Sequence, residues 1–187
     1  MSTLSAFFVR KVTDDAISAV RVMFPRSEIR VTSEFMGVIL DQKANIPEQT
    51  LIELSSYLKT DVMWLSYQSV VDGFEYYHWR TGILLRALVY GCVMERTWER
   101  IEGEPEDWER AAFFDPEVLS FILEDEESDE EKHRLEQFWQ AGELKIGRME
   151  PYLSGQNCAF HVAIYYRFPG WANEPFKIVQ KSSSPDS

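Results

Sequence analysis

The chain has 187 residues, of which 45% are hydrophobic and 14% aromatic, enough apolar material for the core of one ordinary domain. Its formal net charge is −12, and this sign excludes nucleic acid as a general partner because phosphate backbones repel it. The charge is uneven: residues 99–131 hold fifteen acidic and two basic residues, while the rest of the chain is nearly neutral. This imbalance indicates either a strongly solvated surface or a docking surface for a basic protein partner.

The first part of the chain predicts a strand, a helix and then extended structure. β-branched and aromatic residues alternate over residues 4–12, as in a half-buried strand. Residues 14–24 have apolar side chains at helical spacing, and Pro25 ends that helix. Residues 28–40 are extended and break into two short strands either at Gly37 or at the Ser33–Glu34 step.

A second helix begins near Asn45, where Glu48 three residues later completes a capping box. Its buried stripe consists of Leu51, Leu54, Ser55 and Leu58. Residues 62–71 then predict another strand. This order allows a ferredoxin-like βαββαβ unit, provided that residues 28–40 form a hairpin.

Two strand-like runs, residues 74–80 and 83–91, are joined by Thr81-Gly82, which predicts a hairpin with a two-residue turn. A three-residue loop with a bulge at Gly82 is the alternative. In the two-residue register Tyr77, Trp79 and Arg86 share one face with Glu75. If no helix covers that face, it is a mixed aromatic and charged binding patch; if a helix covers it, the rings belong to the core.

The chain is expected to continue as a strand from residue 91 to about residue 101. Arg96, Trp98 and Arg100 would then point the same way. An indole between two guanidinium groups can hold a carboxylate or phosphate of a small ligand. The alternative is that both arginines pair with glutamates of neighbouring strands.

Residues 102–145 predict an acidic helical segment. We expect helices over residues 105–113, over 116–123 with Asp115 as the cap, and over 129–141 with Ser128 as the cap. The third helix should bury Leu135, Phe138 and Trp139. Between the second and third helices lies the predicted acidic interaction patch, which consists of Glu124, Asp125, Glu126, Glu127, Asp129, Glu130 and Glu131. Contiguous acids without a glycine do not match a calcium-binding EF-hand loop.

The remaining motifs argue against catalysis, cofactors and metals. Residues 158–168 predict a last strand, on which Cys158 and His161 face opposite sides and cannot share a metal. Cys92 and Cys158 both lie in apolar runs, so we expect two buried free thiols. No nucleophile elbow or phosphate-binding loop is present. We therefore expect no catalytic residue, cofactor or metal.

These observations favour one α+β domain over residues 1–180, with a largely antiparallel sheet and helices on one face. Residues 1–101 supply most of the sheet and two helices, residues 102–145 the acidic helices, residues 158–168 the final strand, and residues 181–187 a disordered tail. Neither a signal peptide nor a membrane span is apparent, so we expect a cytoplasmic protein. The favoured function is a non-enzymatic interaction module of the inhibitor, immunity or accessory type. The alternative is a sensor or enzyme with an anionic ligand near Arg96, Trp98 and Arg100.

Overall fold

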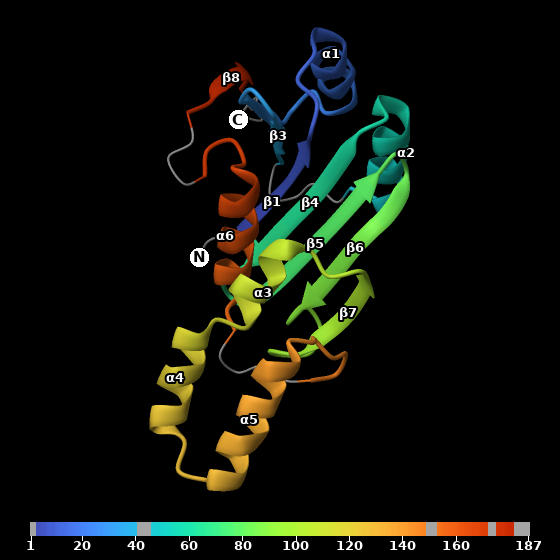
Figure 1. Cartoon of the computed structure of the whole chain (residues 1–187). Coiled ribbons are helices and arrows are strands. Elements are labelled where there is room, and N and C mark those ends of the chain that lie inside the picture. Colours follow the sequence, from blue (N-terminus) through green and yellow to red (C-terminus); the bar gives the residue numbers. More distant parts are fainter. Residues whose placement is uncertain (1–2, 41–45, 149–152, 172–174, 182–187) are drawn as a thin grey trace.

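The computed structural model describes residues 3–40, 46–148, 153–171 and 175–181. The strands are β1 (Thr3–Val9), β2 (Glu28–Val31), β3 (Met36–Ile39), β4 (Asp61–Gln68), β5 (Gly73–Arg80), β6 (Ile83–Tyr90), β7 (Trp98–Gly103) and β8 (Lys177–Gln180). They form one eight-stranded antiparallel sheet in the order β7-β6-β5-β4-β1-β3-β2-β8 (Figure 1). The predicted α+β class with an antiparallel sheet is confirmed.

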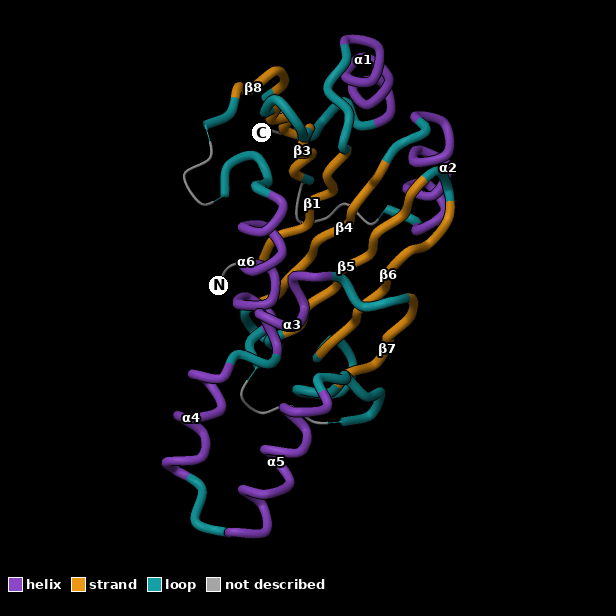
Figure 2. Tube along the Cα trace, viewed as in Figure 1, coloured by secondary structure: helices purple, strands orange, loops and turns teal. Residues whose placement is uncertain are grey.

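The helices cover both faces of this sheet, whereas the sequence predicted helices on one face. They are α1 (Asp14–Met23), α2 (Glu48–Leu58), α3 (Asp107–Phe113), α4 (Pro116–Asp125), α5 (Asp129–Ala141) and α6 (Gly155–Tyr166). Consecutive residues of β1 explain the difference: Phe7 packs with α1 and α2 in one core, and Phe8 packs with α6 in the other. Because both rings are fully buried, both faces of the sheet need a helical cover (Figure 2).

The N-terminal elements follow the order strand, helix, two strands, helix, strand, and their strands lie in the order β4-β1-β3-β2. The extended stretch breaks at the Ser33–Glu34 step, where the Thr32 hydroxyl accepts hydrogen bonds from the Glu34 and Phe35 amides. Gly37, the other expected break, lies inside β3. Assignment of this unit to the ferredoxin-like fold stays a prediction.

Local capping signals placed several helices correctly. Thr13 accepts from the Ala16 amide at the start of α1, and Ser128 accepts from the Glu131 amide at the start of α5. The buried stripe predicted for α2 is the observed one. The proposed cap Asn45 lies outside the described residues. Leu135, Phe138 and Trp139 of α5 are buried as predicted.

Two predicted strands are wrong. Residues 158–168 fall in helix α6 and its C-terminal end, because Cys158, Ala159, Val162 and Ala163 recur at helical spacing and form its buried stripe. The strand expected from residue 91 onward is interrupted: β6 ends at Tyr90, a turn containing Gly91 and Arg96 with positive φ follows, and β7 starts at Trp98. No sequence pattern indicated β8. Of the tail predicted at residues 181–187, residues 182–187 lie outside the described residues.

Across the described part of the chain, none of the helices combines the length and apolar character that crossing a bilayer requires.

Candidate functional site

Helices α4 and α5, with the loop between them, extend beyond the sheet as a helical hairpin (Figure 1). We call residues 116–141 the acidic arm. Its base is anchored by aromatic packing, with the Phe138 ring centroid 5.3 Å from that of Phe114. The Trp139 indole also donates to the Asp115 carbonyl oxygen at 3.0 Å, joining the end of α5 to the start of α4. The arm therefore presents its far end to solvent while its base is fixed to the body.

The predicted acidic patch lies at the far end of this arm. Glu126 and Glu131 are half-buried and have local roles, since Glu126 accepts from the Ser128 amide and Glu131 pairs with Arg134 at 2.7 Å. The other members are exposed: Glu124, Asp125, Glu127, Asp129 and Glu130. Among the described residues, none of these five has a cation within ion-pair distance. Their charge is directed outward.

Several of the remaining acids of residues 99–131 have partners within the chain. Glu106 and Glu109 point into the protein, where they hydrogen-bond His78 and Arg86 respectively. Glu102 pairs instead with Arg100, its neighbour on β7. The acidic block of the sequence therefore divides into paired carboxylates and exposed ones, and the exposed ones include Glu104, Asp107 and Glu117 as well as the arm tip.

The aromatic hairpin has the predicted two-residue turn, because Arg80 pairs with Ile83 and both Thr81 and Gly82 have positive φ. One extra residue on β6 then shifts the register, so that Trp79 faces Leu84 while His78 faces Arg86. Arg86 therefore does not lie on the same face as Tyr77 and Trp79, and this part of the prediction is wrong.

Tyr77 and Trp79 do lie together: their rings are nearly parallel and the ring centroids are 5.4 Å apart. Trp79 is 1% exposed in the core under α2, and Tyr77 packs at the edge of that core. Arg86 lies on the other face of the sheet. The three residues do not form an open patch.

Arg86 instead forms a buried ion pair with Glu109 of α3. Its Nε and Nη2 donate to the two carboxylate oxygens at 2.7 and 2.5 Å, and its Nη1 donates to the carbonyl oxygens of Glu102 and Gly103. This fork-to-fork geometry joins β6 and β7 to α3. Its role is to position the helix.

Arg96, Trp98 and Arg100 do not share a face, which corrects the second predicted site. Arg96 lies in the exposed turn before β7. A register shift beside Trp98 sends its fully buried ring into the core beneath α3, whereas Arg100 stacks over Tyr77 on the opposite face. Arg100 also pairs with Glu102 and Glu48.

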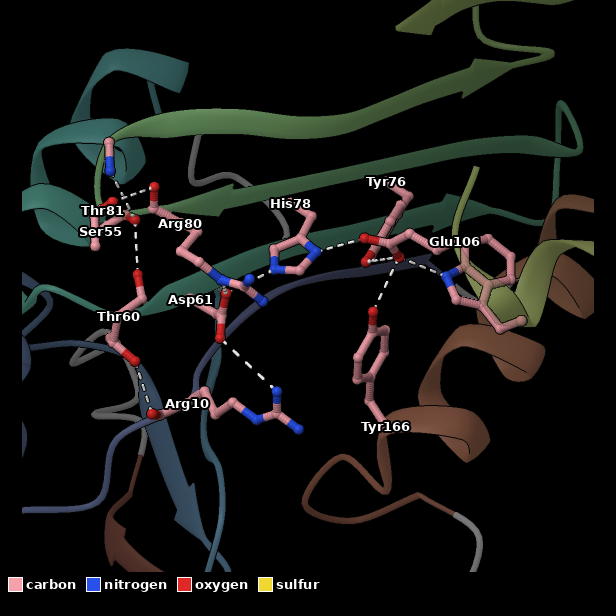
Figure 3. A network of polar contacts seen from close by, with 12 residues as sticks. Arg10, Ser55, Thr60, Asp61, Tyr76, His78, Arg80, Thr81, Glu106 and Tyr166 are labelled. Atoms are coloured by element: carbon pink, nitrogen blue, oxygen red, sulfur yellow. Dashed lines mark hydrogen bonds and ion pairs between the residues drawn. The ribbon is translucent and has the colours of Figure 1, made fainter. Parts of the chain in front are cut away.

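A buried polar centre that the sequence did not predict surrounds His78 (Figure 3). Its Nδ1 lies 2.5 Å from Glu106 Oε1 and its Nε2 lies 3.0 Å from Asp61 Oδ1. The His78 side chain is only 5% exposed. Arg80 donates to Asp61 at 2.6 Å, and Arg10 lies 3.8 Å from the second oxygen of Asp61. Both histidine nitrogens thus face carboxylates.

Three further donors converge on Glu106 Oε2. The Tyr76 hydroxyl and the Trp108 indole donate at 2.7 Å, and the Tyr166 hydroxyl donates at 3.0 Å. These residues come from β5, α3 and α6, so one carboxylate fastens both helices to the sheet. A buried carboxylate held by this many donors is well compensated for its lost hydration.

The charges of this centre reinforce one another. Burial acts to lower the pKa of His78, but hydrogen bonds and charge from Asp61 and Glu106 outweigh it and raise that pKa above its ordinary value. Burial acts to raise the pKa of Asp61, yet the His78 and Arg80 contacts lower it to about 2. The pKa of Glu106 is lowered for the corresponding reason, chiefly by His78. Because each ring nitrogen of His78 already contacts a carboxylate, neither nitrogen is presented to a substrate as a general base.

Sequence reasoning missed this centre because its members are far apart along the chain. Asp61 and Glu106 are separated from His78 by 17 and 28 positions and belong to different elements. The available signal was a histidine between two aromatic residues on a strand buried on both faces. A polar side chain at such a position requires partners.

The two cysteines are free, as expected, but only Cys158 is buried; Cys92 is exposed in the turn after β6. Partial burial of its sulfur, together with the nearby Glu75 and Glu99 carboxylates, raises the pKa of Cys92 to about 12, so its thiol is not an activated nucleophile. Within the described ranges, no three histidine, cysteine or acidic side chains are grouped to hold a metal ion.

No family model matches the chain, and no curated protein or solved structure is significantly similar to it.

Proposed function

We propose that this chain is a non-enzymatic interaction protein, of the inhibitor, immunity or accessory type, whose acidic arm binds a basic protein partner. The observation that carries the proposal is the direction of the charge at the arm tip. Five exposed carboxylates there have no ion-pair partner within the described residues, and the arm holds them away from the body (Figure 1). Such an arrangement attracts and orients an oppositely charged protein.

The arm also carries an aromatic anchor near those charges. The Phe121 side chain of α4 is 68% exposed, three residues before Glu124. Interfaces commonly combine a central aromatic contact with a charged rim, and aromatic residues contribute much of their binding energy. Phe121 is therefore the residue that we expect to contribute the apolar contact.

The same charge argues against nucleic acid and anionic membrane surfaces as partners, and we place the protein in the cytoplasm. The alternative function, an anionic ligand held by Arg96, Trp98 and Arg100, has lost its geometric support because these side chains diverge.

Charge reversal tests the proposal directly. In the arm variant, four exposed tip acids are changed to lysine: Glu124, Asp125, Glu127 and Glu130. In the matched control, four exposed acids outside the arm are changed to lysine: Glu34, Glu53, Glu95 and Glu104. Both variants leave Glu126 and Glu131, which have local hydrogen bonds, unchanged.

Affinity purification from the native cells with the parent chain and both variants identifies candidate partners, and each affinity is then measured with the purified pair. We expect a basic partner whose Kd rises at least about a hundredfold for the arm variant, with a strong dependence on salt, and changes little for the control. Partners that bind all three proteins with equal affinity would refute the role of the arm.

A further inference from the structure

A small cavity lies where the acidic arm joins the body. It has a volume of about 90 Å³ and opens between α3, α4, α5 and α6. Its apolar walls include Phe113, Phe138 and Trp139, while α6 contributes Asn157, Cys158 and His161. Protein interiors leave few voids larger than a water molecule, so an aromatic-lined opening of this size is a candidate site for a very small ligand.

The α6 side of the cavity offers hydrogen-bonding groups that have no partner among the described residues. Within the described residues, the side chains of Ser154, Asn157 and His161 have no protein hydrogen-bond partner. Ser154 precedes α6 without capping it, and Asn157 and His161 are exposed at the mouth. By contrast, the nearby Trp139 indole is already bonded to the Asp115 carbonyl oxygen. The polar groups free for a ligand therefore lie on one side of the cavity.

The charges around the cavity define the ligand class further. Within the described part of the chain, Asp115 is the one carboxylate that lines it, and the arm above it is strongly acidic. Burial raises the pKa of the Cys158 thiol well above its ordinary value, so this thiol adds no charge to the wall. Among the described residues, no arginine or lysine lines the cavity, so an anion would meet the repulsion of Asp115 with no lining cation to offset it.

We propose that this cavity binds a small uncharged aromatic molecule, with its ring against Phe113, Phe138 and Trp139 and its polar edge toward Asn157 and His161. An enclosed cavity of roughly 150 Å³ accepts benzene. The smaller opening here admits part of one ring and leaves a polar substituent at the mouth. The inference goes beyond the proposed function, because the cavity does not depend on any contact made by the arm tip.

Phenol is a suitable probe because it combines one ring with one hydroxyl group. Titration is followed by two-dimensional amide NMR of the full chain. We expect saturable shifts that concentrate around Ala112, Cys158 and His161, with a Kd on the order of 1 mM. Cyclohexanol, which lacks the aromatic ring, and benzoate, which carries a negative charge, should bind at least tenfold more weakly.

Two alanines of α3 provide a matched pair of variants. Ala112 lines the cavity, whereas its neighbour Ala111 is exposed on another side of the helix. Ala112→Met should fill the cavity and weaken phenol binding at least tenfold, while Ala111→Met should leave the Kd within twofold.

A second pair at the exposed mouth keeps the test decisive if Ala112→Met does not fold. Asn157→Leu should weaken phenol binding about fivefold by removing a hydrogen bond, whereas Gln156→Leu, at the adjacent exposed position, should not. Non-saturable or dispersed shifts with phenol, or an unchanged Kd in the cavity variants, would overturn the proposal. Equal binding of benzoate would overturn the assigned ligand class.

Discussion

Arg86 of β6 and Glu109 of α3 form a two-pronged ion pair whose side chains are only 3% and 5% exposed. The pair lies between the sheet and the start of the helical segment that leads to the acidic arm. In such a setting each charge depends on the other, because neither has water to stabilise it.

The two members of this pair should be coupled, so that removing both destabilises the protein by less than the two single removals added together. Glu109→Leu leaves Arg86 charged and buried, and we expect it to lower the free energy of unfolding by about 3–5 kcal/mol. The double variant Arg86→Met/Glu109→Leu should cost less than the sum of the single changes. Urea unfolding followed by circular dichroism measures this cycle, and strictly additive losses would contradict it.

The His78 centre should make stability depend on pH in one direction. The pKa of His78 is raised in the folded protein, so its stabilising charge is fully present below the unfolded pKa of about 6.5 and is lost as pH rises through the folded pKa. The gap in unfolding free energy between the parent and His78→Gln should therefore be largest near about pH 5.5 and shrink toward about pH 9.

The matched control for that experiment is His133→Gln, because His133 is exposed on α5. Its gap from the parent should stay small throughout the same pH series. A His78→Gln gap that is constant, or that widens with rising pH, would show that His78 is not held as the imidazolium.

Two buried tryptophans should respond differently to the same substitution. Trp108 is 3% exposed and its indole donates to Glu106 at 2.7 Å, whereas Trp98 is 0% exposed and its indole nitrogen has no hydrogen-bond partner in the described structure. Trp108→Phe loses a hydrogen bond to a charged group, worth about 1.5–3 kcal/mol. Trp98→Phe removes an unsatisfied donor and should cost less. Chemical denaturation of both variants compares them, and a larger loss at Trp98 would contradict the expectation.

Substitutions at the two positions of the hairpin turn should change the stability of the protein in opposite directions. Thr81 has φ +52°, which is unfavourable for a β-branched residue, and Gly82 has φ +83°. Asparagine tolerates positive φ at the first position of this turn. Thr81→Asn should therefore increase the free energy of unfolding by about 1 kcal/mol and raise the melting temperature. Gly82→Ala should lower it. Calorimetry of both variants tests the pair, and a loss of stability in Thr81→Asn would show that its hydroxyl contact with the Arg80 carbonyl oxygen matters more.

The parts of the fold that local chemistry determines could be predicted from the sequence. The bounds of α5 follow from the Ser128 cap and the spacing of its apolar residues, and the hairpin turn follows from Thr81-Gly82. Helix α6 was not predicted, because its uncharged aromatic composition is equally typical of a strand and its helical stripe appears only against a buried surface. The His78 centre depends on contacts between distant elements, which no local pattern records.

The extra residue on β6 is a β-bulge that determines which face of the sheet the following side chains occupy. Side chains alternate between the two faces of a strand, so the extra residue between Leu84 and Arg86 moves every later side chain of β6 to the opposite face of the sheet. Without it, the guanidinium of Arg86 would point toward the helices of the N-terminal half and away from Glu109. A single inserted position thus assigns this arginine to the half of the molecule that carries the arm, and a deletion there would rewire the hairpin without altering the identity of any remaining residue.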